Sequence, residues 1–184
     1  MKRTFGSMFV GAAGVGATLT LLILAFGDLT EIQIKLLFSI GAVAGFSLLG
    51  LCAALWWERD GAHPLVLLGA VVSVGAMVLA VALIWGLLPA DHRWTILWRA
   101  LAVLAGVTAH TALLLLAHGQ NRWINIVAVA TIVCSWALAG YYIVVLAGAL
   151  PPTMHPSVAP PLAALTSVGT LLTPLLARVF LRAH

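Results

Sequence analysis

Residues 65–88 read LVLLGAVVSVGAMVLAVALIWGLL and contain no charged side chain. A helix needs about 20 mostly apolar residues to cross a hydrocarbon core roughly 30 Å thick. Within lipid every backbone polar group needs a partner inside the protein, and a helix supplies one within the segment itself. This stretch therefore predicts a transmembrane helix.

Five further stretches of the same kind lie on either side of it, separated by short polar loops. They cover residues 9–26, 34–57, 96–117, 124–150 and 162–180. We therefore expect an all-α, polytopic membrane protein built as a bundle of six transmembrane helices. The polar remainder is too short to fold as a separate aqueous domain, so residues 1–184 are expected to form a single integral membrane domain.

The composition of the chain is not that of a soluble globular domain. It is 63% hydrophobic and 8% charged, whereas a soluble domain is about 45–50% apolar and about 25% charged. The formal net charge of +4 would suggest nucleic acid as a partner of a soluble protein. Here the basic residues occur singly at the ends of the apolar stretches, so they are interpreted as topology determinants, and no nucleic-acid partner is expected.

The distribution of basic residues predicts the orientation in a cell inner or plasma membrane. Basic residues are enriched in cytoplasmic loops, and they divide unequally between the two sides: Lys2, Arg3, Arg59, Arg122, Arg178 and Arg182 against Lys35, Arg93 and Arg99. Both termini are therefore expected in the cytoplasm. The first stretch follows basic residues as a secretory signal would, but it exceeds a signal core of about 7–15 residues, so a retained helix is expected.

The predicted hairpin 34–88 is similar in sequence to the predicted hairpin 96–150. Gly45 matches Gly106 at an offset of 61 residues, and Ser73 matches Ser135 at an offset of 62. The sequence Gly-Leu-Leu-Pro at 86–89 likewise matches Gly-Ala-Leu-Pro at 148–151. A parallel duplication of a two-helix hairpin would place a pseudo-twofold axis along the membrane normal. The alternative is a chance alignment of sequences rich in Ala, Val, Leu and Gly.

Small residues four positions apart indicate close helix packing. In lipid, such residues let helix backbones approach one another. The helix-packing positions predicted in this way are Gly41, Gly45, Gly69, Ser73 and Gly106. Packing within one chain is the favoured interpretation, and a homodimer face is the alternative.

One ionisable residue, His110, lies deep in a predicted span, between Thr108 and Thr111. Such a residue is costly in lipid unless it is hydrogen bonded. We expect His110 to point into the bundle and to bond a hydroxyl of another helix, with Ser73, Thr131, Ser135 and Thr170 as candidates. The alternative is a ligand to haem b, which would need a second ligand from another helix if the haem is low-spin.

The sequence contains no zinc-ligand spacing, no Cys-x-x-Cys and no glycine-rich phosphate loop, so no catalytic residue, metal site or cofactor is predicted. By elimination we expect a non-enzymatic scaffold or accessory subunit of a membrane assembly. Its expected partners are membrane lipids and other membrane protein subunits or a second copy. One alternative is a small transporter or channel for a neutral or apolar solute, and another is a haem-binding electron-transfer subunit using His110.

Overall fold

The computed structural model describes residues 7, 10, 11, 14, 30–60, 64–89, 91–116, 122–148 and 163–170. Four long helices are present in this part of the chain: α2 (Glu31–Asp60), α3 (Pro64–Ile84), α4 (His92–Leu116) and α5 (Arg122–Leu146). Residues 163–170 are also helical, and none of the described residues forms a strand. The all-α prediction is confirmed for these residues.

Each of the four long helices is long and apolar enough to cross a membrane. They correspond to the predicted spans 34–57, 65–88, 96–117 and 124–150. All but residues 10, 11 and 14 of the predicted span 9–26, and the greater part of the predicted span 162–180, lie outside the described residues. The chain is thus a multi-pass membrane protein with at least these four candidate spans, and the count of six stays a prediction.

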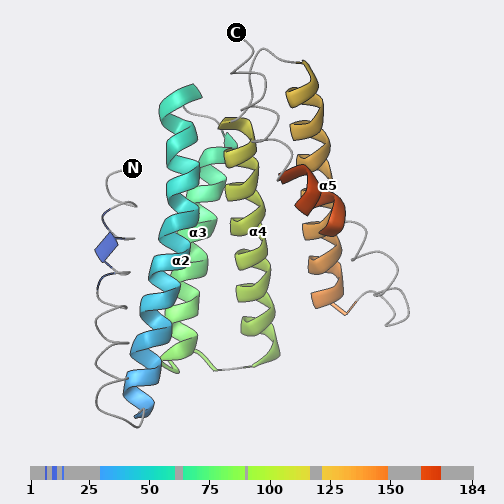
Figure 1. Cartoon of the computed structure of the whole chain (residues 1–184). Helices are drawn as coiled ribbons and strands as arrows, with labels where there is room; N and C mark the ends of the chain where they lie inside the picture. The colour runs from blue at the N-terminus through green and yellow to red at the C-terminus, as the bar shows by residue number, and fades with distance from the viewer. Residues whose placement is uncertain are drawn as a thin grey trace.

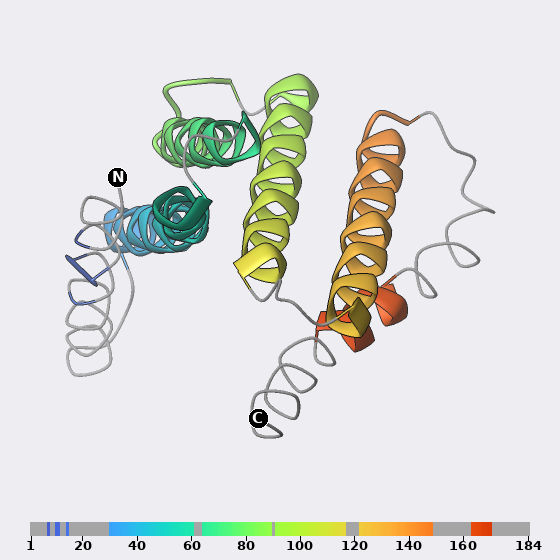
Figure 2. The same ribbon diagram turned by 90° about the horizontal axis from the view of Figure 1, so that it is seen from above.

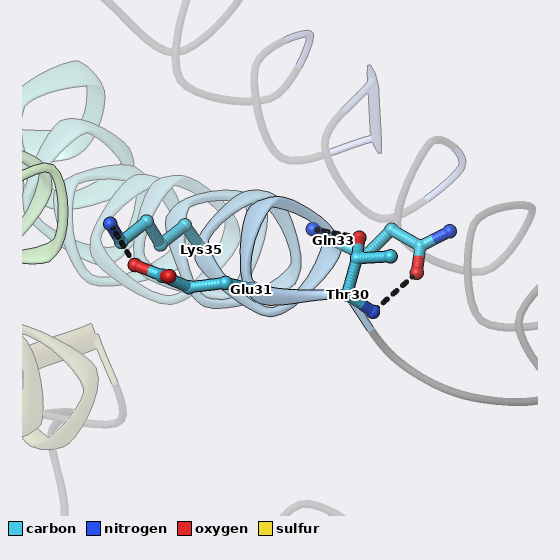
Figure 3. Close-up of polar contacts among 4 residues, drawn as sticks. All are labelled: Thr30, Glu31, Gln33 and Lys35. Carbon is cyan, nitrogen blue, oxygen red and sulfur yellow. Dashed lines mark hydrogen bonds and ion pairs between the residues drawn. The ribbon is translucent and has the colours of Figure 1, made fainter.

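Helix α2 begins with a reciprocal cap at Thr30 (Figure 3). The Thr30 backbone N–H donates to Gln33 Oε1 at 2.8 Å, and the Gln33 backbone N–H donates to Thr30 Oγ1 at 3.4 Å. This is a capping box, which satisfies two of the donors that a helix N-terminus leaves free. Next to this cap, the side chains of Glu31 and Lys35, one helical turn apart, form an ion pair at 2.6 Å. The cap explains why the helix starts at Glu31 rather than at the predicted residue 34.

Local chemistry also explains where α3 and α4 begin. Pro64 occupies the first position of α3, where its missing N–H is not needed. Asp91 caps α4, because its Oδ1 accepts from the Trp94 backbone N–H at 3.1 Å. Helix α4 therefore begins at His92, four residues before the predicted start at 96.

Helices α3 and α5 both end at a glycine with a left-handed backbone. The φ angles are 66° at Gly86 and 71° at Gly148. After α3, Gly86 N–H donates to Leu83 O at 3.2 Å and Leu87 N–H to Ala82 O at 2.9 Å, the paired bonds of a Schellman cap. These caps end the helices four residues before the predicted ends at 88 and 150.

The matching ends agree with the proposed hairpin duplication. Ile84 and Leu146, the last residues of α3 and α5, are separated by the same offset of 62 that relates Gly86 to Gly148. Burial agrees as well, because the matched pairs Ser47 and Thr108, and Ser73 and Ser135, are all buried. The duplication stays a prediction, now with equivalent caps and equivalent buried hydroxyls in both copies.

The helices run alternately up and down (Figure 1). Helices α2, α3 and α4 pack against one another, and α5 packs on α4. Viewed from above, α4 and α5 are inclined relative to α2 and α3 (Figure 2). The main buried cluster, Ala53, Trp56, Val66 and Ala112, lies at the end of the bundle where α2 and α4 finish and α3 starts.

Large apolar side chains cover the outside of the bundle. Phe38 is 64% exposed, Val71 is 67% exposed and Val133 is 62% exposed. In water so many exposed apolar side chains would drive association. In a bilayer it faces a solvent as apolar as itself, which agrees with a membrane-spanning bundle.

Candidate functional site

Helices α2, α3 and α4 approach one another closely at Gly69. A Cβ atom placed on Gly69 would lie 3.3 Å from Ala53 Cβ on α2 and 3.3 Å from Thr108 Oγ1 on α4. Ser73, one turn further along α3, is also buried. Three helices thus meet where α3 presents no side chain, as the small-residue spacing of Gly69 and Ser73 predicts.

The other three glycines predicted to pack against helices lie differently. A Cβ atom on Gly41, Gly45 or Gly106 would meet no atom of the described residues within 4 Å. Gly41 and Gly45 are exposed on α2, whereas Gly106 is half-buried on α4. The four-residue spacing of small residues identifies a helix face without bulky side chains. Whether a neighbouring helix covers that face depends on how the bundle assembles.

His110 makes a hydrogen bond to Thr170, one of its four predicted partners. The distance from His110 Nε2 to Thr170 Oγ1 is 3.2 Å. The Thr170 hydroxyl also donates to the Thr166 carbonyl oxygen at 2.6 Å. Because a hydroxyl has a single hydrogen, Thr170 accepts from His110, which therefore carries its proton on Nε2 and leaves Nδ1 as an acceptor.

A cavity of about 260 Å³ lies beside His110, between α4, α5 and residues 163–170. Ser135 and Tyr142 of α5 line it together with Thr166. The Thr166 hydroxyl is buried and has no hydrogen-bond partner among the described residues. The cavity is otherwise lined by apolar residues, so it is an apolar space with a few polar groups near His110.

The segment 163–170 lies next to α5 (Figure 1). Its Gly169 packs so closely on α5 that a Cβ atom there would collide with the side chain of Thr131. Gly169 is not among the packing positions predicted from the sequence. The sequence does carry a related signal in the same segment, because Thr166 and Thr170 have the four-residue spacing of small residues that marks close packing. The segment is thus fixed to α5 by packing and to α4 by the His110 hydrogen bond.

Most hydroxyls within the spans bond to the backbone of their own helix. Thr108 donates to Leu104 O at 2.9 Å and Thr111 to Val107 O at 2.8 Å. On α5, Thr131 and Ser135 repeat the pattern with the carbonyl four residues earlier. Such bonds remove the cost of a hydroxyl in lipid without requiring another helix.

One deep hydrogen bond joins α4 to α5. Trp136 of α5 donates its Nε1–H to Thr111 Oγ1 at 3.1 Å. Thr111 can accept this bond because its own hydrogen points to Val107 O. The indole nitrogen is therefore satisfied inside the bundle.

The described residues do not bring a second histidine to His110, nor a cluster of ligands for a metal. His92 is the only other described histidine, and it lies 18 residues before His110 on the same helix, about 27 Å away along the axis. No group of three His, Cys, Asp or Glu side chains in the described part of the chain could hold a metal ion. No protein-family model, curated protein or solved structure matches this chain.

Proposed function

We propose that this protein is a non-enzymatic scaffold or accessory subunit of a membrane assembly, and that α5 binds a transmembrane helix of another subunit. The proposal depends on two stripes along α5. One is buried and consists of Ile124, Ala128, Thr131, Ser135 and Ala139. The other, here called the outer stripe, is exposed and consists of Ile126, Ala130, Val133, Ala137, Gly140 and Val144.

The outer stripe has the spacing and the residue sizes of a helix-packing seam. Its members alternate four and three residues apart, which is the repeat of two helices packed along their length. All are small or β-branched, so another backbone can approach closely in lipid. The exposed face of α3 carries Val71, Val74 and Val78 with the same spacing, but the larger Leu67 and Leu68 precede them.

Several polar groups of the spans support a structural role. The hydroxyls of Thr108, Thr111 and Ser135 are used by their own helices, and the Trp136 indole is used by Thr111. A pathway for a solute would instead need polar groups that line a shared passage. These groups stabilise helices and the contact between them.

The proposal includes the orientation with both termini in the cytoplasm of an inner or plasma membrane. Its support is the excess of basic residues on that side and the alternation of the four helices (Figure 1). Reporter fusions after His184 test this part. Activity of a reporter that works only after export would contradict it, and so would a mature protein that begins at Asp28.

Co-purification from native membranes tests the functional part. Tagged wild-type protein is compared with the double variant Ala137→Leu and Gly140→Leu, whose larger side chains fill the outer stripe. The matched control changes two exposed α3 residues, Val71→Leu and Val78→Leu. We expect the wild type and the α3 control to retain the same membrane protein and the α5 variant to lose it. Equal retention by all three proteins would overturn the proposal.

A further inference from the structure

A second and larger cavity lies between α2, α3 and α4. It measures about 510 Å³, which is within the range of about 300–1,000 Å³ typical of sites for small molecules. Its walls include Phe38 and Phe46 of α2, Leu83 of α3, and Thr95 and Trp98 of α4. Apart from Thr95 and Trp98, its described lining residues are apolar.

Small residues create this space. Gly41 lines the cavity, and a Cβ atom there would meet no atom of the described residues within 4 Å. Ala42 on the same helix and Ala80 on α3 also line it. Three positions that could fill the cavity with larger side chains therefore leave it open.

Trp98 gives the cavity a specific chemistry. Its Nε1 is buried and has no hydrogen-bond partner among the described residues. Two other indoles do have partners, because Trp85 donates to Ser39 Oγ at 2.9 Å and Trp136 donates to Thr111 Oγ1 at 3.1 Å. An indole N–H can only donate, so the missing partner is an acceptor.

The position of Trp98 indicates where that acceptor lies in the bilayer. Trp98 follows the start of α4 at His92 by six residues, about 9 Å along the helix axis. Tryptophans at this depth lie near the boundary between the headgroups and the hydrocarbon core. The ester carbonyls of glycerophospholipids lie at the same boundary, directly above their acyl chains.

We propose that this cavity binds one acyl chain of a diacyl glycerophospholipid, whose ester carbonyl accepts a hydrogen bond from Trp98 Nε1. The apolar walls hold the chain, and the indole recognises its first polar group. The inference does not depend on the outer stripe of α5, because the cavity is formed by α2, α3 and α4 alone.

Ester and ether lipids with the same headgroup and chain length provide the test. The dialkyl ether lipid keeps the chains but lacks the carbonyls. Delipidated protein is mixed with each lipid, and bound lipid is counted by native mass spectrometry. We expect the wild type to bind the diacyl lipid about threefold more tightly, the ratio that corresponds to one interhelical hydrogen bond in a membrane. Equal binding of the two lipids would overturn the proposal.

Two variants with a matched control complete the test. Trp98→Phe keeps an aromatic side chain but removes the donor, so the preference for the diacyl lipid should disappear while binding of the ether lipid is retained. Gly41→Phe should fill the cavity and reduce binding of both lipids. Gly45→Phe is its control, because Gly45 is also exposed on α2 but does not line the cavity. Unchanged binding by Gly41→Phe, or retention of a non-lipid molecule in the native protein, would contradict the assignment.

Discussion

His110 Nε2 lies 3.2 Å from Thr170 Oγ1, although the two residues are 60 positions apart in the chain. The bond connects α4, six residues before its end at Leu116, to residues 163–170. The same segment packs through Gly169 against Thr131 of α5. A polar contact and a close backbone approach thus fix this segment to two helices at once.

A double-mutant cycle measures the His110 contact. His110→Leu and Thr170→Val each remove one partner, and the coupling between them is expected to be about 0.6 kcal/mol, the average for interhelical hydrogen bonds in membranes. The measurement is the free energy of unfolding in mixed micelles. Thr166→Val serves as the control, because the Thr166 hydroxyl has no partner among the described residues and its loss should not destabilise. Strictly additive effects of His110→Leu and Thr170→Val would contradict the bond.

The visible spectrum of the purified protein separates a structural histidine from a haem ligand. We expect no Soret band, because Nε2 is bonded to Thr170. His110→Leu should therefore leave the spectrum unchanged. A Soret band in the wild type that disappears in His110→Leu would identify this histidine as a haem ligand and replace the structural account.

Gly69 should not tolerate a large side chain. Gly69→Leu would push side-chain atoms into Ala53 and Thr108, each already 3.3 Å from the position of a Cβ atom. Overpacking of this kind costs about 1–3 kcal/mol. Gly75→Leu is the control on the same helix, because a Cβ atom on Gly75 meets no described atom within 4 Å. Thermal unfolding in detergent should show a clearly lower midpoint for Gly69→Leu and an unchanged midpoint for Gly75→Leu. Equal midpoints for the two variants would contradict a close helix crossing at Gly69.

The caps at Gly86 and Gly148 should respond alike to substitution. An L-residue in the left-handed conformation costs roughly 1–2 kcal/mol, so Gly86→Ala and Gly148→Ala should each destabilise by about that amount. Gly75→Ala, within a helix of ordinary backbone, should leave stability unchanged or raise it. The free energy of unfolding of the three variants is the measurement. A neutral Gly148→Ala beside a destabilising Gly86→Ala would argue against equivalent hairpin ends.

The sequence predicts the helices well because lipid imposes a strong rule on length and polarity. All four described spans were predicted, and the errors lie at their ends, where short-range caps such as Thr30 and Asp91 outweigh hydropathy. Thr170 could be proposed as a partner of His110 because few hydroxyls lie at a suitable depth. The exposed positions of Gly41 and Gly45 could not be predicted, because glycine spacing does not identify the neighbouring helix. Nor could the cavity beside Trp98, because it depends on how three helices diverge.

The outer stripe of α5 is proposed to contact a helix of another protein in the membrane. A photo-reactive amino acid placed at Ala137 in the full chain, irradiated in native membranes, tests this directly. The same label at Val71 on the exposed face of α3 is the control. We expect an adduct with another protein chain from position 137 and lipid adducts alone from position 71. Lipid adducts alone at both positions, or a crosslink from 137 within the same chain, would contradict it.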